Sequence, residues 1–184
     1  MPLVDQPERR WMLSDSPIER HFRRLLVQIA PPIHDPKAYG KGLRGEIERL
    51  ELICKICKNA KIQPVGQSLV MRTNEHLGFR AILKNMGQSP WFGYQTALQS
   101  QGETRLRISW LDTAGQKVES RPNELFVSGQ PQPGEIALAI GMLKAPAQPG
   151  QYQATFVLSM KGMEAYVSAK PLYNLNVTVE SRTK

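Results

Sequence analysis

The chain has 184 residues, 41% of them hydrophobic and 22% charged, which suffices for one ordinary core with a small appendage or for two small units. Its 14 prolines and 14 glycines are dispersed, and this excludes a collagen-like or low-complexity protein. Apolar stretches such as 137–143 are far shorter than the roughly 20 residues that cross a bilayer, so we expect no membrane span. Charged residues at Asp5, Glu8 and Arg9 occupy the place of a secretory apolar run, so we expect a cytoplasmic protein.

The net charge is +8, from 24 Lys and Arg against 16 Asp and Glu, and such a basic chain invites comparison with nucleic-acid-binding proteins. The charges are nevertheless spread evenly, because the parts before and after Pro64 each hold 12 basic and 8 acidic residues. Sequence-independent phosphate binding needs clustered cations. Nucleic-acid binding through a basic surface is therefore the weaker alternative for this chain.

A first helix is predicted to begin at Pro17. Ser16 and Glu19 form a capping box around this proline, which stands at the first helical position. The prolines at 31 and 32 end the helix. Its single apolar face consists of Ile18, Phe22, Leu25, Leu26 and Ile29.

A second helix is predicted over about residues 42–60. At 100° per residue one apolar stripe contains Leu43, Ile47, Leu50, Cys54 and Cys57. Leu52 and Ile56 lie away from this stripe, so one neighbouring element cannot cover the whole helix. Either the helix is sandwiched between the first helix and the part after Pro64, or Leu52 and Ile56, together with Arg49, form a surface for a partner chain.

Cys54 and Cys57 are predicted to be buried core side chains. A structural zinc site needs four ligands, and the three histidines of the chain, His21, His34 and His76, have no matching spacing. A redox pair sits at the N-terminus of a helix, whereas these thiols would lie in its last turns. The sequence therefore predicts no metal site and no cofactor.

From Ser68 onward the apolar period is two, with turn residues between short runs. Strands are predicted near 68–72, 77–84, 94–98, 105–110, 124–127, 135–143, 151–160, 165–168 and 172–180, with a turn over 112–115 before Val118. Seven to nine short strands without intervening helices are typical of an antiparallel β-sandwich. We therefore expect a mainly β protein with a two-helix N-terminal docking segment over 1–66 and a sandwich over 67–184.

Three stretches occur in an order that resembles a known family: 79–91, which contains Asn85 and Gly87, then 106–118, and then 133–159. They resemble the Ig-like β-sandwich domains appended to bacterial glycan-related transferases, and more remotely the Ig-like domain of selective autophagy receptors. The resemblance covers about residues 69–181 and implies an Ig-like sandwich. The receptor domains carry a tryptophan four residues before the asparagine, where this chain has Ala81, so the receptor function does not transfer.

Four residues of these stretches are predicted to have structural roles. Asn85 and Gly87 provide the turn chemistry that is needed between strands. Tyr152 follows Pro149 and Gly150 where a tyrosine corner would tie a loop to the sandwich through its hydroxyl. Trp110 alternates with arginines along a strand and is predicted to be a core indole.

Trp91, Phe92 and Tyr94 form an aromatic cluster after Pro90 and are the loop candidates for binding. Such a cluster stacks on sugar rings or anchors a protein partner. The structural alternative is that Trp91 folds over the open end of the core.

No catalytic signature occurs in the chain, and the adjacent Glu75 and His76 read as polar turn residues, so we expect no enzyme. We expect instead a non-catalytic scaffold or adaptor that binds a partner protein or a second copy through its helical segment and its loops. The alternative is a carbohydrate-binding module that uses Trp91, Phe92 and Tyr94.

Overall fold

The computed structural model describes residues 36–53, 62–94 and 102–182 of the chain. These residues form nine strands and two short helical segments, which confirms the prediction of a mainly β fold. The elements are α2 (Pro36–Gly42), β1 (Gly45–Ile53), β2 (Ile62–Pro64), β3 (Ser68–Arg72), β4 (His76–Asn85), β5 (Thr104–Leu111), β6 (Lys117–Val127), β7 (Ile136–Lys144), β8 (Gly150–Met160), the 3₁₀ helix η4 (Glu164–Tyr166) and β9 (Pro171–Glu180). No helix of these described ranges is long and apolar enough to cross a membrane.

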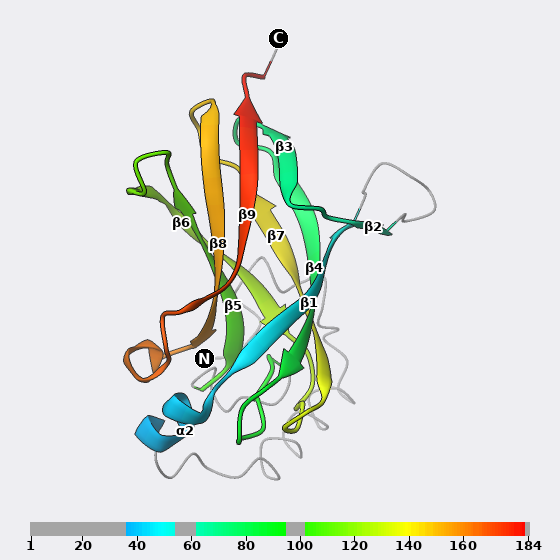
Figure 1. Ribbon diagram of the computed structural model, residues 1–184, viewed down its shortest axis with the longest axis vertical. Coiled ribbons are helices and arrows are strands. Elements are labelled where there is room, and N and C mark those ends of the chain that lie inside the picture. The colour runs from blue at the N-terminus through cyan, green and yellow to red at the C-terminus, as the bar shows by residue number, and fades with distance from the viewer. Residues whose placement is uncertain (1–35, 54–61, 95–101, 183–184) are drawn as a thin grey trace, which may run out of the picture.

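All nine strands belong to one sheet with the order β2-β1-β4-β7-β6-β5-β8-β9-β3. The sheet curls strongly into a half-barrel, so that β8 and β9 lie across the core from β4 and β7 (Figure 1). Neighbouring strands are antiparallel except β3 and β9, which run parallel with Ser68 opposite Asn176. The described strands therefore form a mixed, continuous sheet where the alternation had predicted an antiparallel one.

The two ends of the sheet are joined by the short link 65–67 between β2 and β3. The N–H of Val65 donates to the carbonyl oxygen of Leu50 on β1 at 2.8 Å. The carbonyl oxygen of Gln67 accepts from the N–H of Asn176 on β9 at 3.2 Å. The link thus hydrogen-bonds to both ends of the sheet, and this holds the curl.

Strand β6 is the corner of the curl. It pairs with β5 along much of its length but with β7 only through 125–127. Where β6 and β7 separate, the side chain of Asn123 accepts from the N–H of Lys144 at 2.9 Å and donates to its carbonyl oxygen at 3.3 Å. The side-chain amide of Asn123 therefore bonds to the N–H and the carbonyl oxygen of Lys144 in place of a neighbouring strand, because a buried peptide group needs a partner.

The predicted helix over 42–60 is wrong where the structure describes it, because Gly45–Ile53 is strand β1. A β-bulge at Glu48 shifts the register, so that Ile47 pairs with Leu83 and Leu50 pairs with Ala81. The bulge puts Ile47 and Leu50, three residues apart, on the same core-facing side. This spacing imitates a helical period and misled the periodicity analysis.

The predicted domain boundary at residue 67 falls inside this sheet, since β1 and β2 pair with the strands that follow. The predicted strand at 165–168 is wrong. After a turn in which Gly162 has φ +75°, Glu164–Tyr166 is the 3₁₀ helix η4. The predicted helix from Pro17, the core roles of Cys54 and Cys57, and residues 95–98 of a predicted strand lie outside the described residues.

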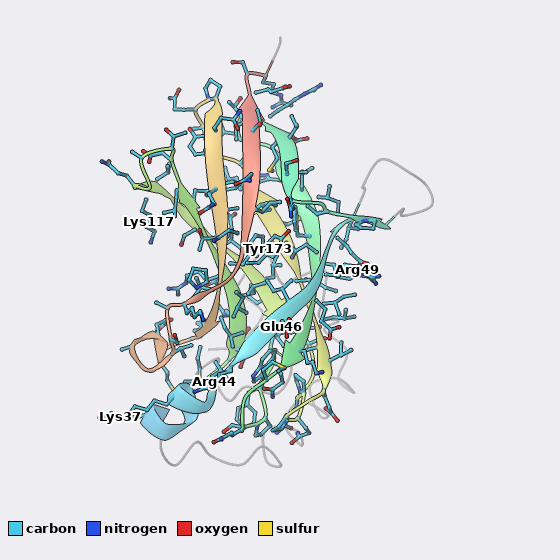
Figure 2. The ribbon with its side chains drawn as sticks, viewed as in Figure 1. Lys37, Arg44, Glu46, Arg49, Lys117 and Tyr173 are labelled. Carbon is cyan, nitrogen blue, oxygen red and sulfur yellow. The ribbon has the colours of Figure 1, made fainter. Side chains whose placement is uncertain are left out.

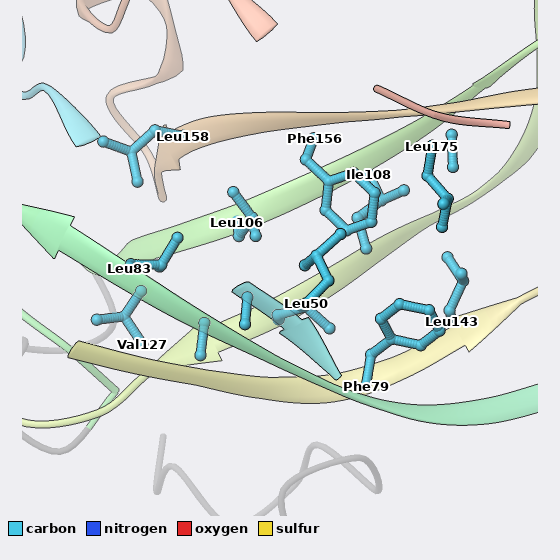
Figure 3. Close-up of a cluster of buried hydrophobic side chains, with 14 of the residues drawn as sticks. Leu50, Phe79, Leu83, Leu106, Ile108, Val127, Leu143, Phe156, Leu158 and Leu175 are labelled. Carbon is cyan, nitrogen blue, oxygen red and sulfur yellow. The ribbon is translucent and has the colours of Figure 1, made fainter. Parts of the chain in front are cut away.

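The core lies inside the curl and combines side chains from both ends of the sheet. Figure 3 shows Leu106, Ile108 and Phe156 from one wall facing Phe79 and Leu143 from the other. Leu50 of β1 joins them and is 3% exposed. Residues on both sides of the link 65–67 therefore share one hydrophobic core.

Shortening Leu50 tests the place of β1 in this core. We expect Leu50→Ala to lower the free energy of unfolding by about 2–5 kcal/mol, because a cavity opens between packed side chains. Ile136→Ala, at a strand position that is 60% exposed, should cost much less and serves as the matched control. Urea unfolding measures both values, and equal losses would contradict the burial of β1.

Candidate functional site

The predicted aromatic cluster lies along the segment 91–94, which is held against the β6–β7 connection. The backbone N–H groups of Trp91, Gly93 and Tyr94 donate to the carbonyl oxygens of Pro131, Gly129 and Val127 at 2.9–3.0 Å. A Cβ atom on Gly93 would lie 2.4 Å from the Val127 carbonyl oxygen, so only glycine permits this approach.

The indole of Trp91 is a core side chain. It is 0% exposed, and a Cβ atom on Gly45 would lie 2.9 Å from the Trp91 ring. Phe92 is 5% exposed, and Tyr94 is half-buried. Stacking on a sugar ring needs an accessible aromatic face, so the Trp91 and Phe92 rings do not provide the predicted stacking surface.

Asn85 is a buried connector between two loops at the end of β4. Its Nδ2 donates to the carbonyl oxygens of Ser89 and Pro131 at 2.9 and 3.1 Å, and its Oδ1 accepts from the N–H of Gly87 at 2.9 Å. A Cβ atom on Gly87 would lie 2.3 Å from the carbonyl oxygen of Gly42. Asn85 and Gly87 thus hold the β4–β5 connection against the β6–β7 connection and against residues 42–44, which precede β1.

Tyr152 and Trp110 lie together at the opposite end of the core. The Tyr152 hydroxyl donates to the carbonyl oxygen of Gln148 at 3.0 Å, four residues earlier, as in a tyrosine corner. The rings of Tyr152 and Trp110 meet edge to face with centroids 6.2 Å apart. The Trp110 Nε1–H donates to the carbonyl oxygen of Lys144 at 3.1 Å, across the gap between β6 and β7.

The predicted partner surface of the second helix does not exist as predicted, because Arg49 and Leu52 lie on β1. Leu52 packs against the core opposite Phe79, whereas Arg49 points away from it (Figure 2). The Arg49 Nε lies 2.8 Å from Glu51 Oε1, and Arg80 lies 2.5 Å from the other oxygen. Ile56 lies outside the described residues.

A cluster of charged side chains on β5, β6 and η4 was missed by the sequence analysis. Glu103, 0% exposed, lies 3.2 Å from Arg105, which also contacts Glu124. Arg107 lies 3.8 Å from Glu124 and 3.4 Å from Glu164. The alternation of Arg105 and Arg107 on one strand face was the available signal, but two of their partners, Glu124 and Glu164, come from distant elements.

The pKa of Glu164 lies below the usual value of a glutamate. Partial burial raises this pKa, but hydrogen bonds with the backbone of Glu164 and Gly162 and the charges of Arg107 and Arg105 lower it by more. A lowered pKa in the folded state contributes stability above the unfolded pKa, and this contribution is lost as the pH falls through the folded pKa. The cluster therefore joins η4 to β5 at neutral pH.

The outer side of β4 and β7 carries apolar side chains in adjacent register positions. Ile82 pairs with Leu138, and Ile136 lies opposite Lys84. Ile136 is 60% exposed and Leu138 37% exposed, while Ile82 and Ile140 are half-buried. We call Ile82, Ile136, Leu138 and Ile140 the β4–β7 apolar face.

The described ranges contain no group of three or more His, Cys, Asp or Glu side chains that could hold a metal ion. Of the three histidines only His76 is described, and it is exposed at the start of β4. The thiols of Cys54 and Cys57 lie outside the described residues.

No protein-family model and no curated protein matches the chain. Among solved structures, the C-terminal domain of Wzt aligns with 83% of this chain and 89% of its own, at 12% identity and a TM-score of 0.43. A CARDB domain from Pyrococcus furiosus, solved in complex with di-metal ions, aligns with 60% of this chain and 83% of its own, at 14% identity and a TM-score of 0.32.

The Pseudomonas fluorescens alkylpurine DNA glycosylase AlkC, bound to DNA containing an abasic-site analogue, aligns with 96% of this chain at 10% identity and a TM-score of 0.41. This chain spans 40% of the length of that glycosylase. The comparisons thus give distant structural matches to β-rich domains and no sequence family.

Adding a methyl group at Gly87 tests the fastening role of the Asn85 loop. We expect Gly87→Ala to lower the free energy of unfolding by about 1–3 kcal/mol, because its Cβ would press on the Gly42 carbonyl oxygen. Gly66→Ala is the matched control, since no atom lies within 4 Å of its added Cβ. Thermal unfolding measures both, and a Gly87→Ala protein as stable as the control would contradict this packing.

Proposed function

We propose that this chain is a non-catalytic binding module that docks a partner protein on the β4–β7 apolar face. The observation that carries the proposal is the exposure of Ile136 and Leu138, at 60% and 37%, beside Ile82 and Ile140 on paired strands. Large contiguous exposed apolar side chains are typical of interaction surfaces, since their burial removes apolar area from water.

The charge around this face favours an acidic partner. Lys84 lies opposite Ile136, and Lys144 is exposed at the other end of β7. The nearby Glu135 carboxylate already accepts the N–H of Gln132 at 2.8 Å. With a net charge of +8, the chain attracts negative partners at long range. The occupant we propose is a segment of another protein with apolar side chains flanked by carboxylates.

The exposure and the charge of the candidate surfaces favour this proposal over the two alternatives. The carbohydrate alternative at 91–94 required accessible aromatic rings, and Trp91 is 0% exposed. Nucleic-acid binding would require clustered free cations, whereas Arg80, Arg105 and Arg107 are all in ion pairs with glutamates. An apolar face with a basic edge fits an acidic, partly apolar protein segment better than a polyanion.

Selection of a phage-displayed library of random dodecapeptides on the immobilised full chain tests the proposal. We expect enriched peptides that combine apolar residues with Asp or Glu. Leu138→Glu should weaken their binding by about tenfold or more, because it places a charge in the centre of the contact. Val70→Glu changes an equally aliphatic, 59% exposed side chain on β3 and should leave binding unchanged.

Peptides that bind the Leu138→Glu protein as well as the wild type would overturn the proposal, as would enrichment of basic peptides. Sedimentation velocity tests whether a second copy of this chain, instead of another protein, binds the β4–β7 apolar face. A wild-type dimer that Leu138→Glu converts to a monomer would assign the face to a second copy of this chain and would contradict a separate partner.

A further inference from the structure

A second outer surface has the opposite chemistry, because it is uncharged and rich in amides and hydroxyls. One register row crosses the sheet from Leu111 on β5 through Gln153 on β8 to Asn176 on β9 and Ser68 on β3. The adjacent rows contain Gln151, Thr178 and Val70 on one side, and Ser109, Thr155 and Asn174 on the other. We call these three rows the neutral polar face.

This composition is unusual for the surface of a chain with 40 charged side chains. Lysine, arginine and glutamate are the common residues of a merely solvated surface. On the neutral polar face, ten outward positions in three rows carry amide, hydroxyl or aliphatic side chains instead. Asn and Gln each donate and accept hydrogen bonds, so they match groups that also do both.

A pocket of about 360 Å³ opens at this face, within the size range of small-molecule sites. The row members Leu111, Gln153 and Asn176 line it together with Gln151. The turn after β5 contributes the hydroxyl of Thr113 and the carboxylate of Asp112, whose Oδ1 already accepts the N–H groups of Ala114 and Gln116. The pocket therefore offers the neutral amides of Gln151, Gln153 and Asn176 beside the aliphatic side chain of Leu111 and the carboxylate of Asp112.

An unpartnered hydroxyl lies in the row next to the pocket. Thr155 is on the same side of β8 as Gln151 and Gln153, is only 8% exposed, and its Oγ1 has no hydrogen-bond partner in the structure. A buried hydroxyl without a partner is costly, so a water or a ligand hydroxyl that reached it would complete its bonding. This observation is independent of the pocket and points to the same face.

We propose that the neutral polar face binds an uncharged saccharide, with one sugar unit in the pocket lined by Gln153 and Asn176. Sugar hydroxyls donate and accept hydrogen bonds as side-chain amides do, while a C–H face of the ring packs on Leu111. A phosphate or nucleic acid would need cations that these rows lack. The site is separate from the β4–β7 apolar face and does not depend on the function proposed above.

Titration of the full, ¹⁵N-labelled chain with maltotriose, cellotriose, mannotriose, galactotriose and chitotriose tests the site by NMR. We expect at least one trisaccharide, at millimolar concentration, to shift the side-chain amide signals of Gln153 and Asn176. The double variant Gln153→Ala with Asn176→Ala should weaken that binding about tenfold or more, because two sets of hydrogen bonds are lost. Both side chains lie on the surface, so the unfolding midpoint of the variant should stay near that of the wild type.

Gln88→Ala removes an exposed amide from the β4–β5 connection and is the matched control, which should bind the trisaccharide as the wild type does. Leu138→Glu should also retain the binding, so failure of the docking proposal and failure of this one are distinguishable. The inference is overturned if none of the five trisaccharides shifts these signals. It is equally overturned if the double variant binds as tightly as the Gln88→Ala protein.

Discussion

The fold depends on the short link 65–67, which joins the two ends of a nine-stranded sheet. Three residues cannot span an open sheet of nine strands, because each strand adds roughly 4.8 Å of width. The sheet must therefore curl until β1 and β9 approach, and hydrogen bonds from Val65 to Leu50 and from Asn176 to Gln67 hold this arrangement. The interior of the curl is where the inward-facing apolar side chains of the described strands leave water.

The same curl gives the molecule two outer surfaces of different chemistry. Strands β1 and β3 to β9 each contribute one side to the core, so any binding chemistry on them must use the other side or the connections. On β4 and β7 that other side is apolar with a basic edge, whereas on β8 and β9 it is neutral and polar. Asn85 and the backbone of Trp91 make hydrogen bonds that hold the connections 86–94 and 128–135 together. We therefore place the proposed sites on the strand faces.

The errors of the sequence analysis have identifiable physical causes. At β1 a bulge at Glu48 converts the strand period of two into a spacing of three, so Ile47 and Leu50 imitate one face of a helix. At 91–94 the composition left open whether Trp91 is exposed or folds over the core, and the space in front of Gly45 accepts its indole and buries it. The contact of Arg105 with Glu124 could not be predicted either, since Glu124 meets it only through the pairing of β5 with β6.

By itself the sequence determined the mainly β class, the positions of most strands after Ser68 and the turn roles of Asn85, Gly87 and Tyr152. These are local properties, because alternation, turn chemistry and a hydroxyl four residues from its acceptor act over short stretches of chain. Only the tertiary structure decided that β1 is a strand, that β3 runs parallel to β9, and which side chains share each outer surface. Those features depend on pairing between residues as distant as Ser68 and Asn176. The alternation within either segment does not show which strand it will pair with.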